Sequence, residues 1–219
     1  MIGGSPCQDL CSMGSREGLK GKKSSLFFEY MRALKEVKPK YFLLENNASM
    51  TKQNKDIITG ILGVEPVMIN SADFSAQNRK RLYWTNIPVE KYQSQGLTIR
   101  DIAEPESAKS KYDITDKVIK YSGIEYTGRK IQKTVTSKIR ELSQKSKCLG
   151  TYCGDYGNNT GLIMKQGERY YIVTPREAER LQTLPDDYTA GITDKKRYFA
   201  IGNGWTVDVI AHIFKGLNM

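Results

Sequence analysis

A cysteine near the start of the chain has the sequence surroundings of a reactive nucleophile. Cys7 follows the stretch Gly-Gly-Ser-Pro, in which two glycines free the backbone and Pro6 fixes the approach to the thiol. Glu45 stands at the end of an apolar run, and Arg79 and Arg81 lie in the stretch QNRKR. An arginine beside a thiol favours the thiolate even without a histidine base. These four side chains would supply a soft nucleophile, an acid and a cationic clamp.

The scarcity of histidine narrows the chemistry further. The sequence has one histidine, His212, which falls in the pattern of the last helix, where we expect it at the core boundary or facing solvent. Ser-His-Asp or Cys-His catalysis and histidine-rich metal sites are therefore disfavoured. The spacing of the four cysteines fits no common zinc pattern, so we predict no metal site and interpret Cys11, Cys148 and Cys153 as structural or incidental.

The charge of the chain favours a polyanionic partner. The 219 residues carry a formal net charge of +10, which suits nucleic acid. From 109 to 147 the sequence has eleven Lys or Arg against four Asp or Glu, a run that contacts phosphates or forms a solvated face. No apolar run approaches the ~18 residues of a membrane span, and no signal peptide is recognisable, so we expect a cytoplasmic protein with no membrane partner.

Helices and strands are expected to alternate in the first part of the chain. Apolar residues recur at helical spacing over 26–37, and a second helix is expected over 54–62. Apolar runs predict strands at 41–47, 65–74 and 81–87. This order indicates an α/β fold with a largely parallel sheet, whose strand ends would gather the loops of Cys7, Glu45 and the two arginines at one edge.

The periodicity changes after this α/β part. It weakens from about 89 to 172, where we expect a small irregular domain. Thr174, Pro175 and Glu177 then form the pattern of a helix start with a capping box, and a last helix is expected over about 206–217. We therefore predict three parts: a catalytic part (1–88), a recognition domain (89–172) and closing helices that return to the catalytic part (173–219).

Five motifs in sequence order resemble those of the C5-cytosine DNA methyltransferases. They are GGSPCQ, ENN, QNRKR, TPREAERLQTLPDDY and GNGWTVDVIAHI. In the second motif Asn47 stands where the family has valine, and KSKCLGTYCGDYGNNTG resembles the end of the family's target-recognition region. The resemblance implies an S-adenosylmethionine-dependent methyltransferase (Rossmann-like) sheet with a small irregular target-recognition domain. An RNA cytosine methyltransferase is disfavoured, since those enzymes place their cysteines differently.

The resemblance also implies a reaction and a role for each candidate residue. A cytosine flipped out of duplex DNA would be attacked at C6 by Cys7, while protonated Glu45 interacts with N3. Arg79 and Arg81 would orient the base and the carboxyl group. C5 of the cytosine would then accept a methyl group from S-adenosylmethionine.

The closing motif implies contacts to the cofactor, but a second cofactor motif is not found. Asn203, Gly204 and Trp205 would border S-adenosylmethionine. The family's Phe-x-Gly-x-Gly loop has no counterpart in this sequence, which predicts either a truncated enzyme or one whose cofactor part is a separate chain. On its own, the chain is expected to bind S-adenosylmethionine poorly. The alternative function is that of a non-catalytic DNA-binding remnant or regulatory subunit.

Overall fold

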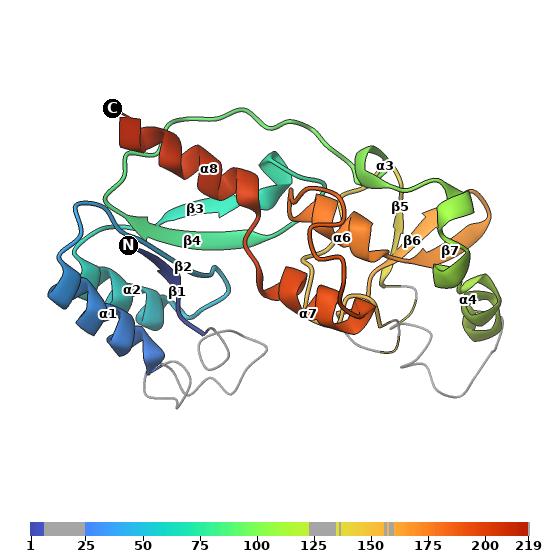
Figure 1. Cartoon of the computed structure of the whole chain (residues 1–219), viewed down its shortest axis with the longest axis horizontal. Coiled ribbons are helices and arrows are strands. Elements are labelled where there is room, and N and C mark those ends of the chain that lie inside the picture. Colours follow the sequence, from blue (N-terminus) through green and yellow to red (C-terminus); the bar gives the residue numbers. More distant parts are fainter. Residues whose placement is uncertain (7–24, 123–134, 136, 156, 158–159, 219) are drawn as a thin grey trace. The chain divides into compact units, whose positions relative to one another are not determined.

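The structure, a computed structural model, divides into two compact units (Figure 1). It describes residues 1–6, 25–122, 135, 137–155, 157 and 160–218. The first unit comprises Met1–Asn70, Lys80–Tyr92 and Ala211–Met219, and the second comprises Ser71–Arg79 and Gln93–Ile210.

A four-stranded sheet forms the centre of the first unit. Its strands, in spatial order, are β1 (Ile2–Gly4), β2 (Leu43–Asn47), β4 (Lys80–Thr85) and β3 (Val67–Asn70). β1 and β2 are parallel, whereas β4 is antiparallel to both of its neighbours. The expectation of a largely parallel sheet is therefore wrong for these strands. The segment joining β3 to β4 is too short for the crossover helix that parallel neighbours need, whereas α1 lies between β1 and β2.

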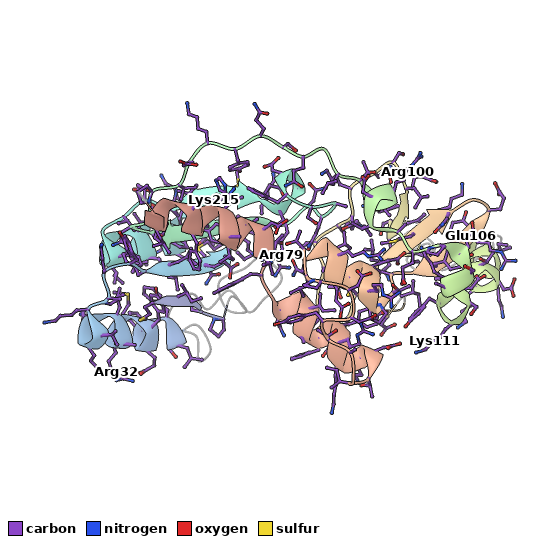
Figure 2. All side chains as sticks on the ribbon, turned by 45° about the horizontal axis from the view of Figure 1, so that its top comes forward. Arg32, Arg79, Arg100, Glu106, Lys111 and Lys215 are labelled. Atoms are coloured by element: carbon purple, nitrogen blue, oxygen red, sulfur yellow. The ribbon has the colours of Figure 1, made fainter. Side chains whose placement is uncertain are left out.

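Two helices cover one face of this sheet (Figure 1). They are α1 (Leu26–Val37) and α2 (Lys52–Leu62). α1 has the predicted bounds and ends at Lys38, which takes the left-handed conformation (φ 46°) just before Pro39. α2 begins earlier than predicted because the Thr51 side chain caps it, accepting a hydrogen bond from the Asn54 amide. On the exposed side of α1, Arg32 pairs with two glutamates of the same helix (Figure 2).

The core of the first unit lies between these helices and the sheet. Its buried members are Phe27, Met31, Leu44, Met50, Ile58, Leu82 and Trp84. The fully buried indole of Trp84 on β4 donates a hydrogen bond of 2.9 Å to Thr59 on α2, so its polar atom is satisfied. Alternate residues of β2 and β4 thus fix the sheet face that meets the helices.

The last helix, α8 (Val207–Lys215), enters the first unit at Ala211 and is followed by a 3-10 turn (Gly216–Asn218). His212 is buried, with 7% exposure, and is not solvent-facing. Its Nε2 lies 3.0 Å from the carbonyl oxygen of Glu90, and its ring meets that of Tyr92 edge-on. Contacts distant in the sequence therefore explain its burial.

The second unit combines short helices with a three-stranded sheet. Its helices are α3 (Ile99–Ile102), α4 (Thr115–Ser122), α6 (Pro175–Leu181) and α7 (Asp194–Asn203), with 3-10 turns at Ser71–Asp73, Glu106–Ala108 and Ser110–Tyr112. Its strands, in spatial order, are β5 (Ile139–Glu141), β6 (Ile163–Gln166) and β7 (Arg169–Ile172). β5 is parallel to β6, and β6 and β7 form a tight hairpin in which Gly167 takes a positive φ of 57°. The stretch 89–172 thus contains a small sheet beside its loops.

The start of α6 has the predicted capping box. The Thr174 hydroxyl accepts a hydrogen bond from the Glu177 amide (3.1 Å), and the Glu177 carboxylate accepts one from the Thr174 amide (2.9 Å). Pro175 occupies the first helical position. The main core of this unit includes side chains from α6, α7 and β6, among them Ala178, Leu181, Tyr198, Ile201 and Met164.

No helix within the described residues is long and apolar enough to cross a membrane.

Glycine packing yields a stability prediction. A Cβ at Gly202 in α7 would lie 2.5 Å from the backbone of Gly150, whereas a Cβ at Gly60 in α2 would meet nothing within 4 Å. Gly202→Ala should therefore lower the free energy of unfolding by about 1–3 kcal/mol through overpacking. Gly60→Ala should raise it by about 0.5–1 kcal/mol, because alanine loses less backbone entropy in a helix. Urea denaturation measures both, and equal effects of the two variants would contradict the packing of α7 described here.

Candidate active site

The pairing of β1 with β2 sets where the segment that leads to Cys7 leaves the sheet. Gly4, the last residue of β1, lies opposite Glu45 in the parallel register. A Cβ on the preceding Gly3 would come within 2.9 Å of the Tyr30 ring on α1, so a side chain there would displace that ring. Cys7 itself lies outside the described residues.

Asn46 anchors this departing segment. Its side chain, 1% exposed, donates hydrogen bonds to the carbonyl oxygen (3.1 Å) and the hydroxyl (3.0 Å) of Ser5. Its Oδ1 accepts a hydrogen bond of 2.8 Å from the Asn47 amide, which fixes the orientation of the carboxamide. Asn46 therefore holds the backbone two residues before Cys7. The sequence reasoning missed this role, although Asn46 lies within the ENN motif.

Glu45 and Arg81, which are expected to converge at one sheet edge, form an ion pair. Arg81 Nε lies 2.9 Å from Glu45 Oε1, and the two side chains are only 12% and 13% exposed. The antiparallel register places Arg81 opposite Asn47 and Glu45 opposite Tyr83, so the charged pair is a diagonal cross-strand pair. Partial burial reduces solvent screening and strengthens such a pair. The structure thus brings two of the four predicted catalytic residues into contact.

Arg79 belongs to the second unit and binds its backbone. The guanidinium, in a residue that is 5% exposed, donates to the carbonyl oxygens of Leu149 (3.1 Å), Gly202 (3.3 Å) and Gly204 (2.9 Å). It also lies 3.4 Å from the sulfur of Cys148. Within the described residues, these bonds give Arg79 the task of fixing the turn after α7. Its predicted role beside the target base stays a prediction.

The three residues predicted to border the cofactor lie in that turn. Asn203 ends α7 with an exposed side chain, and Gly204 and Trp205 are half-buried. The carbonyl oxygen of Gly204 accepts hydrogen bonds from both Arg79 and the fully buried Gln182. The backbone that presents Asn203 is therefore held on two sides.

Two buried glutamines that the sequence reasoning passed over support the same turn. Gln77 Nε2 donates to the carbonyl of Leu181 (2.9 Å) and to the side chain of Gln182 (3.1 Å). Gln182 donates to Ile201, and its Oε1 accepts from the Thr206 hydroxyl (2.8 Å). The sequence did contain a signal for this role, because Gln77 lies inside the QNRKR motif and Gln182 inside the TPREAERLQTLPDDY motif.

The cysteines that the structure describes differ in environment. Cys148 is exposed, whereas burial raises the pKa of the Cys153 thiol to about 12, so Cys153 remains protonated at neutral pH. Among the residues that the structure describes, no cluster of three or more His, Cys, Asp or Glu could hold a metal ion. Cys11, like Cys7, lies outside the described residues.

A buried ion pair connects the basic segment to α6. Lys109 and Glu177 are both fully buried, with Nζ 2.5 Å from Oε1, and Lys109 also donates to Gln166 (2.8 Å). The same carboxylate accepts hydrogen bonds from the backbone amides of Glu104 and Thr174. Since Lys109 is enclosed, it cannot contact phosphates as a member of the 109–147 run.

A model of the family "C-5 cytosine-specific DNA methylase" matches residues 1–218. The chain belongs to this family. The resemblance inferred from the motifs is thereby confirmed, and with it the expectation of an S-adenosylmethionine-dependent methyltransferase family.

Curated relatives of the chain include bacterial type II methyltransferases. The chain is 27% identical over 239 residues to Type II methyltransferase M.SsoII of Shigella sonnei, a match that covers 96% of the chain and 61% of the relative. It is 26% identical over 243 residues to Type II methyltransferase M1.ScrFI of Lactococcus lactis subsp. cremoris, covering 96% and 59%. The chain thus spans about three fifths of the length of these DNA methylase family relatives.

Solved structures support the methyltransferase fold. The Dnmt2 methyltransferase of S. pombe superposes with a TM-score of 0.70 at 19% identity, covering 100% of this chain and 78% of that one. The methyltransferase EhMeth of Entamoeba histolytica superposes with a TM-score of 0.66 at 19% identity, covering 99% and 77%. The predicted α/β methyltransferase fold class is confirmed.

The contribution of the buried Lys109–Glu177 ion pair to stability can be compared with that of the exposed Lys111–Asp194 pair. Lys109→Met should lower the free energy of unfolding by about 3–5 kcal/mol, because it leaves the Glu177 carboxylate buried without its counter-charge. Lys111→Met removes a pair whose lysine is 72% exposed and should cost about 1 kcal/mol or less. Chemical denaturation followed by circular dichroism compares them, and a decrease for Lys109→Met no greater than that for Lys111→Met would refute the role of the pair.

Proposed function

We propose that the chain acts as a DNA (cytosine-5)-methyltransferase, alone or together with a separate chain. It would transfer a methyl group from S-adenosylmethionine to C5 of a cytosine flipped out of duplex DNA. The observation that carries this proposal is the register of β1 and β2, in which Gly4 faces Glu45 and Asn46 binds Ser5. Because Cys7 follows Ser5 by two residues, this register favours a nucleophile and an acid at the same sheet edge.

Cys7 carries the covalent step of the proposed reaction. Its thiolate forms a bond to C6 of the cytosine, and the electron pair moves through the ring toward N3. Glu45, in its protonated form, donates a hydrogen bond or a proton to N3 and so relieves the developing charge. C5 becomes nucleophilic and would take the methyl group that S-adenosylmethionine supplies, which leaves the neutral thioether of S-adenosylhomocysteine. Transfer of the C5 proton to a base then restores the C5–C6 double bond as the thiolate of Cys7 leaves, and N3 returns to Glu45 any proton that it received.

The arginines are proposed to position these groups. Arg81 holds the carboxyl group of Glu45 in one orientation, which lowers the entropic cost of reaching N3. Arg79 is proposed to orient the target base while it fixes the turn after α7.

The residues of that turn fit one side of S-adenosylmethionine, which supplies an electrophilic methyl group. The exposed carboxamide of Asn203 can both donate and accept hydrogen bonds, and Trp205 offers an aromatic ring beside the fixed backbone of Gly204. We propose that these three residues hold the adenosine-containing cofactor.

The substrate and setting of the activity follow from the same proposal. Duplex DNA is the proposed partner, with residues 89–172 as the target-recognition domain and 173–219 as the closing helices. The curated relatives are named type II methyltransferases, which favours a cytoplasmic role in bacterial or phage DNA modification.

Covalent capture on DNA tests the assignment of Cys7. A pool of random-sequence duplexes in which 5-fluorocytosine replaces every cytosine is incubated with S-adenosylmethionine and the chain, supplemented with a separate polypeptide that carries the missing Phe-x-Gly-x-Gly cofactor part. The fluorine at C5 blocks the last proton loss, so a denaturation-resistant protein–DNA adduct should accumulate. Electrophoresis under denaturing conditions detects it.

Two cysteine variants make this experiment decisive. Cys7→Ser should abolish the adduct, whereas Cys11→Ser, in the same segment, should retain it. An adduct of undiminished yield with Cys7→Ser would refute the nucleophile. A chain that binds the duplex and never forms the adduct, even in the presence of that cofactor part, would instead support a non-catalytic DNA-binding subunit.

The basic segment makes a separate prediction about DNA affinity. Lys120 and Lys147 are exposed members of the run, whereas Lys109 and Lys138 are buried. The double variant Lys120→Gln and Lys147→Gln should weaken binding to all duplex sequences alike. The log–log salt dependence should flatten by roughly 0.9 for each phosphate that the protein no longer neutralises.

An exposed lysine outside the run provides the control. Lys35→Gln on α1 should leave both the affinity and the salt slope unchanged. If the double variant has the salt slope of the unmodified protein, the run is a solvated face.

A further inference from the structure

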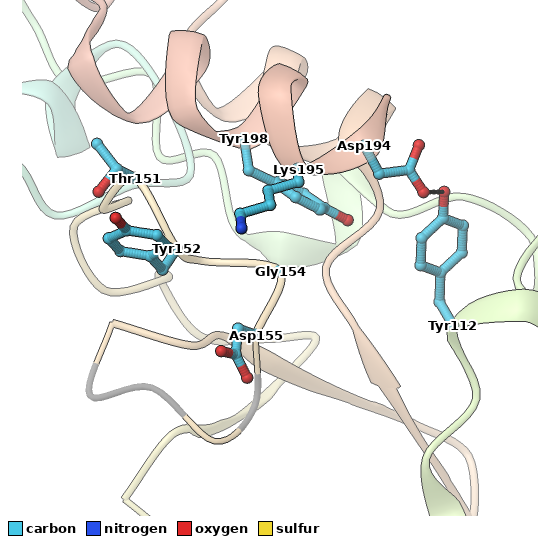
Figure 3. Close-up of a pocket in the computed structure, with 8 residues that line it drawn as sticks. All are labelled: Tyr112, Thr151, Tyr152, Gly154, Asp155, Asp194, Lys195 and Tyr198. Carbon is cyan, nitrogen blue, oxygen red and sulfur yellow. Dashed lines mark hydrogen bonds between the residues drawn. The ribbon is translucent and has the colours of Figure 1, made fainter. Parts of the chain in front are cut away.

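A pocket in the second unit has no part in the reaction proposed above. It has a volume of about 360 Å³, at the lower end of the roughly 300–1,000 Å³ typical of small-molecule sites. Its walls come from the loop 151–155, the start of α7 and Tyr112; the lining residues are Tyr112, Thr151, Tyr152, Gly154, Asp155, Asp194, Lys195 and Tyr198 (Figure 3).

The groups at the back of the pocket are already engaged in hydrogen bonds or in close packing. The Tyr198 hydroxyl donates to the carbonyl of Val173 (2.6 Å), and a Cβ at Gly154 would lie 2.0 Å from the Tyr198 ring, so loop and ring pack closely. The Asp194 carboxylate accepts hydrogen bonds from Tyr112 (2.9 Å) and Lys111 (2.6 Å). Asp194 therefore already has a cationic partner in Lys111.

Several polar groups at the front of the pocket have no hydrogen-bond or ion-pair partner among the described residues. Figure 3 shows the Lys195 side chain extending from α7 toward the space beside Tyr152 and Asp155. Within the described part of the chain, neither the Lys195 ammonium nor the hydroxyls of Tyr152 and Thr151 take part in a hydrogen bond or ion pair. The Tyr152 residue is 46% exposed. An aromatic face, a cation and hydrogen-bonding groups thus surround one space.

We propose that this pocket binds a nucleotide unit whose base lies outside a base-pair stack. The Tyr152 ring offers a stacking face for the base, as aromatic side chains do in proteins that bind single strands. The Lys195 ammonium binds the phosphate, while Thr151 and Asp155 can hydrogen-bond the edge of the base. The net charge of +10 favours a phosphate-bearing ligand over a neutral aromatic one.

The proposed nucleotide is distinct from the reacting cytosine. Glu45 and Arg81 do not line the pocket and belong to the first unit. The inference rests on the proposed function in taking DNA as the first source of the nucleotide. A free mononucleotide has the same chemistry and is the second source.

Binding of gapped DNA tests this inference. The probes are a fluorescent duplex with a three-nucleotide single-stranded gap and the same duplex without a gap. Both are titrated by anisotropy with the full chain carrying Cys7→Ser, so that covalent capture does not contribute. Tyr152→Leu should weaken binding to the gapped duplex roughly tenfold, because it removes the stacking face, and should change binding to the intact duplex less than about twofold. Lys195→Gln should lower the salt slope on the gapped duplex by roughly 0.7.

Matched variants and a competitor identify the source. Tyr188→Leu and Lys196→Gln, at exposed positions outside the pocket, should behave like the parent protein. Displacement of the gapped duplex by deoxyadenosine monophosphate would assign the pocket to free nucleotides as well as to DNA, and failure to displace it would assign it to DNA alone. If Tyr152→Leu and Lys195→Gln change the binding of neither probe nor competitor, the inference is overturned. The binding test uses the Cys7→Ser protein, which is expected to form no covalent adduct. A negative result for the pocket is therefore independent of the covalent-capture experiment that tests the proposed methyl transfer.

Discussion

The parallel pairing of β1 with β2 is the constraint on which the candidate active site depends. Three residue pairs fix the register and place Gly4 beside Glu45. A slip by one residue would turn the side chains of β2 to the opposite face, taking Leu44 out of the core beneath α1 and α2 and removing Glu45 from Arg81. The hydrophobic core on one face of the sheet and the ion pair at its edge therefore enforce the same register.

Asn46 fixes the path of the chain where it leaves β1, because its side chain binds Ser5. The buried carboxamide satisfies three hydrogen bonds, two to Ser5 and one to the Asn47 amide. An unpaired buried amide costs about 1–3 kcal/mol, so the Ser5 backbone and the Asn46 side chain stabilise one another. The antiparallel entry of β4 brings Arg81 to the same end of β2. One strand end thus collects the proposed acid Glu45, its cationic partner Arg81 and the backbone that precedes Cys7, the proposed nucleophile.

Buried carboxylates on α6 have a comparable role in the second unit. Glu177 binds Lys109 and two backbone amides, and Glu179 accepts hydrogen bonds from the Asp187 amide, from Thr189 and from Arg197. Burial raises the pKa of Glu179, but the hydrogen bonds from Thr189 and Arg197 outweigh this effect and leave the pKa below its ordinary value of 4.5. The Glu179 carboxylate therefore stabilises the fold at pH values above 4.5. This contribution to stability disappears as the pH falls through the lowered pKa. Through these two carboxylates, the seven-residue helix α6 binds a segment that precedes it in the sequence, around Lys109, and a segment that follows it, around Asp187 and Thr189.

Local features were predictable from the sequence, whereas long-range pairing was not. The bounds of α1 and the capping box of Thr174 and Glu177 depend on neighbouring residues, and both were predicted. The convergence of Arg81 and Glu45 was predicted, but from a parallel sheet, whereas an antiparallel strand brings Arg81 to Glu45. The antiparallel direction of β4 and the burial of Lys109 depend on partners distant in the sequence. Periodicity has no access to such partners, so both interpretations of the basic run, phosphate contacts and a solvated face, left Lys109 exposed.

The most direct test of the β1–β2 constraint is the rate of covalent capture by an Asn46→Asp variant. This change keeps the acceptor oxygen and removes the donor that holds Ser5, but it also adds a negative charge, so Asn46→Leu, which removes the donor without adding a charge, is measured beside it. The rate of adduct formation with 5-fluorocytosine duplexes should fall roughly tenfold to a hundredfold, since small misplacements of a nucleophile have effects of this size. Non-covalent affinity for the same duplexes should stay within about twofold of the parent value, since Asn46 is buried. Capture at the rate of the unmodified chain would contradict the assignment of Asn46 as the residue that positions the segment leading to Cys7.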